Sequence, residues 1–258
     1  NQTAVLVILM CKTVLKYLVP VLILRCCFRM PRRVAYHWKL DSPREFPAAI
    51  AVTLIVFAVA NVWLLFSPVN FLSSSTLGEA YYTVSYMRRS YQIVYLVFEV
   101  LAISICKELL LHGDMLHVLR QFGDWDAVIL TAVVAVCLSH SCTTILMELT
   151  FSLVSGVAVL RSGSVVPAIF CRLFGLFAME IWQSSFWQAY CLLFLFLVLI
   201  AGILLCLLSI RPTRKNPALL TQKHYLTLRE RLYTVMHVGP LSIVLILCVI
   251  LMVIEVIF

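Results

Sequence analysis

The chain has 258 residues, of which 63% are hydrophobic and 12% are charged, and its mean hydropathy is +1.02. A soluble domain is about half apolar and a quarter charged, so this composition excludes an ordinary water-soluble protein. The net charge of +8 comes mainly from Lys and Arg in short segments beside apolar runs, where lipid headgroups and topology account for it. We therefore expect membrane lipids and not nucleic acid as partners.

Apolar runs of about 20 residues recur along the chain, and each is long enough to cross the hydrocarbon core of a bilayer. They are continuous and do not alternate with polar residues, which predicts helices and excludes a β-barrel. The predicted fold class is all-α: one polytopic transmembrane helical bundle over residues 1–258. In chain order its eight predicted spans are residues 4–28, 46–70, 91–111, 126–144, 145–161, 163–181, 184–210 and 234–258.

Two basic segments, 25–45 and 211–233, are too short to fold alone and are predicted to be cytoplasmic loops. Lys and Arg gather in the loops after the first, third, fifth and seventh spans, whereas the opposite loops hold only Arg88 and Arg89. Cytoplasmic loops carry the excess of Lys and Arg, so this bias predicts both termini on the lumenal or outer side. The first apolar run continues past any plausible cleavage site, which predicts a retained span.

Seven of the ten cysteines lie inside apolar runs, where a thiol behaves as a small hydrophobe. They predict neither a disulfide framework nor a metal site, and no cofactor is expected. Gly156, Gly163 and Gly175 are predicted to be points where helices approach closely.

Ionisable groups inside predicted spans are the first place to search for function, because burying them in a bilayer is costly. Glu99, Glu108 and His112 follow one another at helical or near-helical spacing, and Lys107 projects about 100° away from Glu108. Two carboxylates, one imidazole and two cations are predicted to partner one another in a buried polar network, which could serve only to hold helices together. The members of this predicted network are Glu99, Lys107, Glu108 and Arg172, and the other ionisable residues in the spans are His140, Glu148 and Glu180.

The middle of the chain carries three motifs in a fixed order. They are Lys107-Glu108-Leu109-Leu110-Leu111-His112-Gly113, then Phe122-Gly123-Asp124-Trp125 followed by His140, then Leu160-Arg161-Ser162-Gly163-Ser164-Val165-Val166-Pro167-Ala168-Ile169. Their order and spacing resemble the CAAX protease and bacteriocin-processing (CPBP) family of intramembrane proteases, over about 70 residues and without a gap. The resemblance implies a family core at about residues 91–181, with extra spans at 1–70 and 184–258.

The resemblance also implies which positions would be catalytic. In that family the first glutamate of a Glu-Glu-x-x-x-Arg-Gly motif and the histidine of a Phe-x-x-x-His motif activate a water molecule, and a His-x-x-x-Asn motif stabilises the oxyanion. Only the second glutamate, Glu108, and the second-motif histidine, His140, are retained. The first glutamate is replaced by Lys107, the arginine by His112, the phenylalanine by Val136, the third-motif histidine by Arg172 and the asparagine by Leu176.

These replacements predict lost catalysis, because an ammonium group is not a proton acceptor and a guanidinium does not deprotonate in proteins. The leading hypothesis is a catalytically impaired family member that acts as a binding or scaffold subunit for membrane proteins or lipidated tails. The alternative is an active endopeptidase for prenylated or other membrane substrates, with Glu108 and His140 as a rearranged base and Arg172 as the oxyanion contact.

A transporter is a third hypothesis, but the sequence shows neither paired broken helices nor repeat symmetry. The resemblance implies the endoplasmic reticulum or another internal membrane as the location, and other membrane protein subunits or prenylated tails as partners.

Overall fold

The computed structural model describes residues 2–28, 38–39, 45–66, 86–139, 145–183, 190–209, 230 and 233. Every regular element in this part of the chain is helical, which confirms the all-α prediction. The long helices are α1 (Gln2–Phe28), α3 (Glu45–Phe66), α5 (Arg89–Glu108), α7 (Asp124–Ser139), α8 (Ile145–Ser162), α9 (Val166–Gln183) and α11 (Cys191–Ser209).

Each of the first seven predicted spans overlaps one of these helices, with ends that differ by a few residues, whereas the eighth, 234–258, lies outside the described residues. One described helix, Gln2–Cys26, is long and apolar enough to cross a membrane by itself. Shorter apolar helices cover Phe46–Val62, Val166–Ala178 and Leu192–Leu207. The all-helical architecture therefore agrees with the sequence, while the number of spans stays a prediction.

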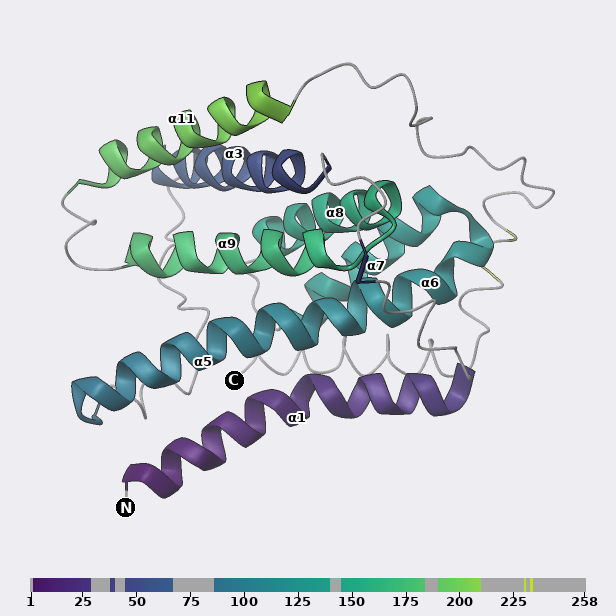
Figure 1. The fold of residues 1–258 in the computed structure, drawn as a ribbon, viewed down its shortest axis with the longest axis horizontal. Coiled ribbons are helices and arrows are strands. Elements are labelled where there is room, and N and C mark those ends of the chain that lie inside the picture. The colour runs from purple at the N-terminus through teal and green to yellow at the C-terminus, as the bar shows by residue number, and fades with distance from the viewer. Residues whose placement is uncertain are drawn as a thin grey trace.

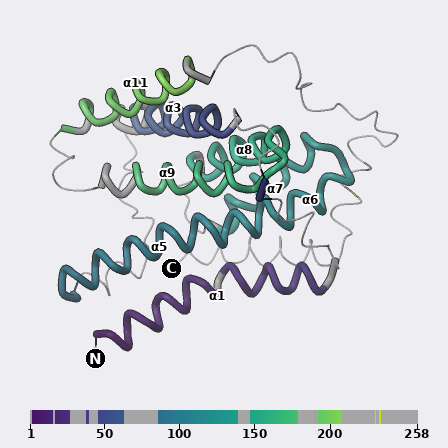
Figure 2. The backbone as a smooth tube through the Cα atoms, viewed as in Figure 1, coloured from purple at the N-terminus to yellow at the C-terminus, as the bar shows by residue number. Residues whose placement is uncertain are grey.

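The helices form layers that lie roughly parallel or antiparallel to one another (Figure 1). Helix α11 packs along α3 on one side, α8 and α9 lie in the middle, and α5 and α1 form the opposite side (Figures 1 and 2). Helices α1, α5 and α11 run in one direction, and α3 and α9 run in the other. Helix α1 contacts mainly α5 and the segment that follows it, so it sits at the edge of the bundle.

Glycines let three helix pairs approach closely. A methyl group at Gly202 would lie 3.1 Å from the Ala51 carbonyl oxygen, so α11 needs glycine there to pack on α3. At Gly175 it would lie 2.7 Å from the Phe151 ring, and at Gly156 it would lie 3.1 Å from Val128. Small residues at helix interfaces are typical of membrane bundles. The close approach predicted at Gly156 and Gly175 is thus confirmed.

Gly163 has a different role from the one predicted. It lies in the turn between α8 and α9 with φ of 69°, a left-handed conformation that side chains disfavour. The flanking serines complete the turn: the Ser162 hydroxyl donates to the Ser164 carbonyl, and the Ser164 hydroxyl accepts from the Val166 backbone N–H at the start of α9. The turn therefore fixes where α9 begins, and with it the position of Arg172 six residues later.

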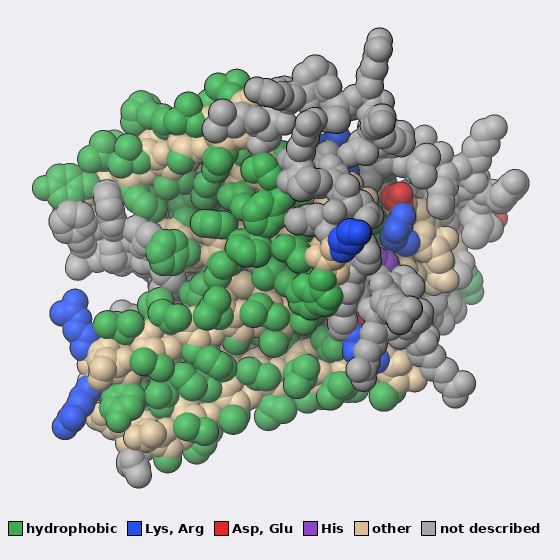
Figure 3. All heavy atoms as spheres, viewed as in Figure 1, with side chains coloured by type: hydrophobic (Ala, Val, Ile, Leu, Met, Phe, Trp, Pro, Cys, Tyr) green, Lys and Arg blue, Asp and Glu red, His purple; other side chains and the backbone are tan. Residues whose placement is uncertain are grey.

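A broad apolar surface separates the charged ends of the molecule (Figure 3). Helices α1, α5 and α11 expose large hydrophobic side chains along their outer faces, with Ile8, Ile93 and Leu207 each more than half exposed. Water would solvate such a surface poorly, and contiguous apolar patches of this kind mark contact with lipid or another protein.

Candidate functional site: a buried ion network

Five ionisable side chains from three neighbouring segments meet in the interior. Lys107 and Glu108 end α5, His112 follows within the π-helix η2 (Leu109–Met115), Glu148 lies in the first turn of α8, and Arg172 lies in α9. The side chains of Glu108, His112 and Arg172 are fully buried, that of Lys107 is 2% exposed, and that of Glu148 is 13% exposed. Burial of this many charges is tolerated only when they are paired.

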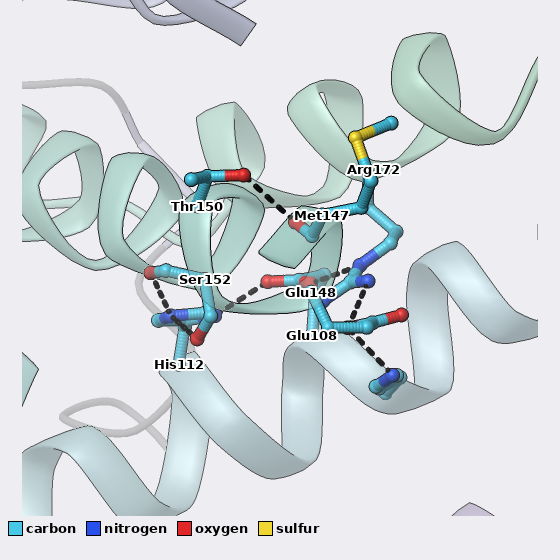
Figure 4. Close-up of polar contacts among 8 residues, drawn as sticks. Glu108, His112, Met147, Glu148, Thr150, Ser152 and Arg172 are labelled. Atoms are coloured by element: carbon cyan, nitrogen blue, oxygen red, sulfur yellow. Dashed lines mark hydrogen bonds and ion pairs between the residues drawn. The ribbon is translucent and has the colours of Figure 1, made fainter. Parts of the chain in front are cut away.

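The charges pair in alternating order. Lys107 Nζ lies 2.9 Å from Glu148 Oε2, and the same oxygen accepts from Arg172 Nη1 at 2.6 Å. Arg172 Nε donates to Glu108 Oε1 at 2.7 Å, so this one guanidinium bridges two carboxylates. Figure 4 shows Arg172 reaching from its helix toward both glutamates. The chain of contacts ties α5, α8 and α9 together.

His112 extends this chain toward the middle of α8. Its Nδ1 lies 2.5 Å from Glu108 Oε2, one helical turn earlier. Its Nε2 lies 3.0 Å from the Ser152 carbonyl oxygen and 3.3 Å from the Ser152 hydroxyl. The imidazole can lie this close to α8 because Gly156 has no side chain: a methyl group there would lie 3.5 Å from His112 Nε2. His112 therefore occupies the second oxygen of the Glu108 carboxylate.

The π-helical turn begins immediately after Glu108. All of its residues except the first are buried, and its Asp114 pairs with Arg25 at the end of α1, with 3.5 Å between Arg25 Nε and Asp114 Oδ2. A π-helix is wider than an α-helix and is often found at functional sites. Here it brings His112 and Asp114 inward at the point where α1, α5 and α8 meet.

The structure brings together only some of the site residues predicted from the sequence. It brings Lys107, Glu108 and Arg172 together. Glu99 is buried on α5, about 13 Å earlier along the helix axis, where it interacts with the Tyr95 hydroxyl, and the ion pairs described above do not include it. His140 lies outside the described residues, as does the side chain of Glu180. Leu176 is buried one turn after Arg172, and its apolar side chain offers no hydrogen bond.

Two residues of the site, Glu148 and Ser152, had no predicted partner from the sequence. Glu148 had been identified only as an ionisable residue in a predicted span, yet it is the partner of both cations. Ser152 carries no charge and gave no sequence signal. The one available clue was charge balance, because two buried cations next to a single retained glutamate call for another carboxylate.

The described residues include no group of three His, Cys, Asp or Glu side chains placed to hold a metal ion. All four carboxylate contacts of the network are made to protein cations or to His112. In chemical terms, the Glu108 carboxylate is already bonded to Arg172 and His112, and its pairing with the Arg172 guanidinium stabilises the ionised form and makes it a weaker proton acceptor.

The described helices form a bundle with a broad apolar surface around a buried network of ion pairs, an architecture typical of proteins that lie in a membrane. Residues 89–178 match the family model described as Type II CAAX prenyl endopeptidase Rce1-like. This match confirms the resemblance stated from the motifs, and the family it describes is one of membrane-embedded proteins. No curated protein and no solved structure matches the chain.

Proposed function

We propose that this protein is a non-catalytic member of the CAAX protease family that binds other membrane components with the fold its catalytic relatives use for cleavage. One observation carries the proposal: Lys107 and Arg172 stand at catalytic positions of the family and are paired with Glu148 and Glu108. A water-activating carboxylate must be free to accept a proton, and an oxyanion site needs donors that are not already engaged. Ion pairing of this kind supports a structural role for the former site.

The alternative is an active peptidase that uses Glu108 with His140. It requires Glu108 to accept a proton while its carboxylate is bonded to two partners. Those partners are Arg172 at 2.7 Å and His112 at 2.5 Å, both fully buried. Protonation of Glu108 would leave the buried Arg172 guanidinium with only one charged partner, Glu148, which opposes the proton transfer. The pairing therefore favours the non-catalytic role.

We also propose that the chain crosses the membrane several times. Connections at one end of the helices carry Arg25, Lys39, Arg120 and Arg161, whereas Arg88 and Arg89 lie where α5 begins, at the other end. Under the positive-inside rule the first end is cytoplasmic and the termini are lumenal. The proposed location is the endoplasmic reticulum or another internal membrane. The proposed partners are lipids, other membrane protein subunits and prenylated tails.

The test is a peptidase assay on the purified full chain in lipid nanodiscs, with a fluorogenic peptide that carries a prenylated C-a-a-X terminus and with its unprenylated form. We expect no cleavage above the protein-free rate. Turnover that disappears in Glu108→Gln and persists in Arg89→Gln, whose side chain is exposed at the far end of α5, would establish the peptidase instead.

A further inference from the structure

A lysine lies near the middle of α1, the helix at the edge of the bundle. The part of α1 that is long and apolar enough to cross a membrane runs from Gln2 to Cys26, and Lys12 is two residues before its midpoint. The hydrocarbon core of a bilayer is about 30 Å thick, so the nearer boundary of a core centred on this segment is about 12 Å from Lys12 along the axis. The four methylene groups of a lysine do not span that distance, so the ammonium group stays at membrane depth.

Lys12 lies on the outer face of α1, within a stripe of apolar side chains. Its own side chain is exposed, and so are large apolar side chains at helical spacing before and after it, namely Ile8, Leu15, Val19 and Leu22. The opposite face of α1 packs against α5 and η2. The outer face therefore presents a cation in the middle of an apolar surface.

Lipid tails are a poor environment for such a group. Charged side chains inside membrane spans are rare because hydrocarbon offers them neither an acceptor nor a counter-charge. Lys12 also interacts within the chain, yet its side chain is exposed, and an ammonium group with three N–H donors can make an inner and an outer contact together. A carboxylate on a neighbouring helix supplies both the charge and the acceptor, as Glu148 does for the buried Lys107.

We propose that the outer face of α1 is the docking surface for a transmembrane helix of another protein that carries a carboxylate near the middle of its span. This inference rests on the proposed membrane crossing and partner binding, and it names the chemistry of the partner. Ile8, Leu15, Val19 and Leu22 supply the apolar packing surface. Lys12 sets the depth and rotation of the partner, because one polar position in an apolar helix interface specifies the register.

Energy transfer in phosphatidylcholine vesicles tests the proposal, with a donor fluorophore on the full chain and an acceptor on three synthetic transmembrane helices of Leu and Ala. The three helices differ only in the central residue, which is Glu, Leu or Lys. We expect the Glu helix to associate about tenfold or more tightly than the Leu helix, because an ion pair replaces lipid around Lys12. The Lys helix should associate least. Equal association of the Glu and Leu helices overturns the proposal.

Substitutions of Lys12 show whether the preference belongs to this face. Lys12→Leu should abolish the preference for the Glu helix, and Lys12→Glu should reverse it, so that the Lys helix associates most tightly. Arg89→Gln removes an exposed cation at the start of α5 and should leave the preference unchanged. Thermal unfolding shows whether each variant folds, and if Lys12→Glu does not, the Lys12→Leu result decides. A preference for the Glu helix that persists in Lys12→Leu overturns the proposal.

Other occupants of this face would give different results. Energy transfer between two labelled copies of the chain that is lost in Lys12→Leu would assign the face to a second copy. Displacement of the Glu helix by oleate, but not by oleyl alcohol, would assign it to a lipid carboxylate. Either result overturns the partner helix. Cleavage in the peptidase assay would instead remove the proposed non-catalytic role and leave helix association as it is, so the two failures are distinguishable.

Discussion

At the scale of single residues, the buried Lys107 is accompanied by a matching carboxylate on another helix. Lys107 is 2% exposed and pairs with Glu148 at 2.9 Å, and Arg172 shares the same carboxylate oxygen. An isolated ammonium in this interior would carry a desolvation cost of several kcal/mol. The side chain of Glu148 offsets this cost, so positions 107, 148 and 172 form one electrostatic unit.

Glu148→Gln should therefore destabilise the protein strongly. It leaves Lys107 without its carboxylate and Arg172 with one partner instead of two, and losing one member of a buried pair costs about 3–5 kcal/mol. Thermal unfolding in detergent, followed by circular dichroism, measures the effect.

The matched control is Asp124→Asn, which breaks the Arg120–Asp124 pair at 2.9 Å, where Arg120 is 43% exposed. A pair at the surface contributes about 0–1 kcal/mol. The double variant Lys107→Met with Glu148→Gln removes both charges and should recover part of the lost stability. Equal losses in Glu148→Gln and Asp124→Asn would contradict the buried network.

Gly156→Ala should disturb the position of His112. The added methyl group would lie 3.1 Å from one Val128 methyl and 3.5 Å from His112 Nε2, so α7 and the imidazole must both shift. Overpacking of this kind typically costs about 1–3 kcal/mol. Combining it with Val128→Ala opens space on the α7 side and should restore most of the stability. The unfolding temperatures of the single and double variants measure both effects. An unchanged unfolding temperature in Gly156→Ala would show that α7 and α8 are not in close contact there.

At the scale of elements, the turn between α8 and α9 sets the geometry of the site. Gly163 supplies the positive φ, and Ser164 accepts the hydrogen bond from the Val166 N–H. Arg172 is less than two turns into α9, so an error in where α9 starts would rotate its guanidinium away from Glu108 and Glu148.

Gly163→Ala should cost about 1–2 kcal/mol, because a side chain in the left-handed region is strained. Ser164→Ala should cost about 1 kcal/mol through the lost cap. Ser162→Gly is a useful comparison, since it removes the two bonds of this hydroxyl, one donated to the Ser164 carbonyl and one accepted from the Ser164 N–H, and places no side chain in the left-handed region. Chemical unfolding curves measure all three. A Gly163→Ala variant as stable as the parent would mean that the turn adopts another backbone conformation.

At the scale of the whole molecule, the direction of the helices and the distribution of basic residues give one orientation. Arg25 lies in the last turn of α1 and Arg161 in the last turn of α8. Arg120 follows α5 in the sequence, and the basic segment 211–233 follows α11. The segment 67–88 joins the end of α3 to the start of α5, at the opposite end of the helices, and carries one basic residue, Arg88.

Glycosylation mapping in microsomes tests this orientation. An acceptor sequon inserted within residues 67–85 should be glycosylated, because that connection is proposed to be lumenal, while the same sequon inserted within 211–233 should stay unmodified. A sequon within 34–44 serves as a second cytoplasmic control. Modification of only the acceptor in 211–233 would reverse the orientation, and modification of the acceptors in both 67–85 and 211–233 would mean that an even number of spans separates them.

The amino-acid sequence by itself determined the all-helical architecture and the resemblance of residues 89–178 to the CAAX protease family. Continuous apolar runs leave the backbone no other way to satisfy its hydrogen bonds in lipid. The order of the motifs also directed attention to positions 107, 108 and 172, which the structure brings together.

Only the tertiary structure decided the partners of those residues. Glu148 lies 24 residues before Arg172, and nothing in its local sequence separates it from Glu99, the carboxylate that had been assigned to the network. Which carboxylate pairs with Lys107 and Arg172 depends on how the helices are rotated and on how closely α8 approaches α5. Three local features act on this packing: Gly156, the π-helix after Glu108, and the turn at Gly163. Pairing of buried charges depends on distances of a few ångströms, and such distances arise from packing between helices that are remote in sequence.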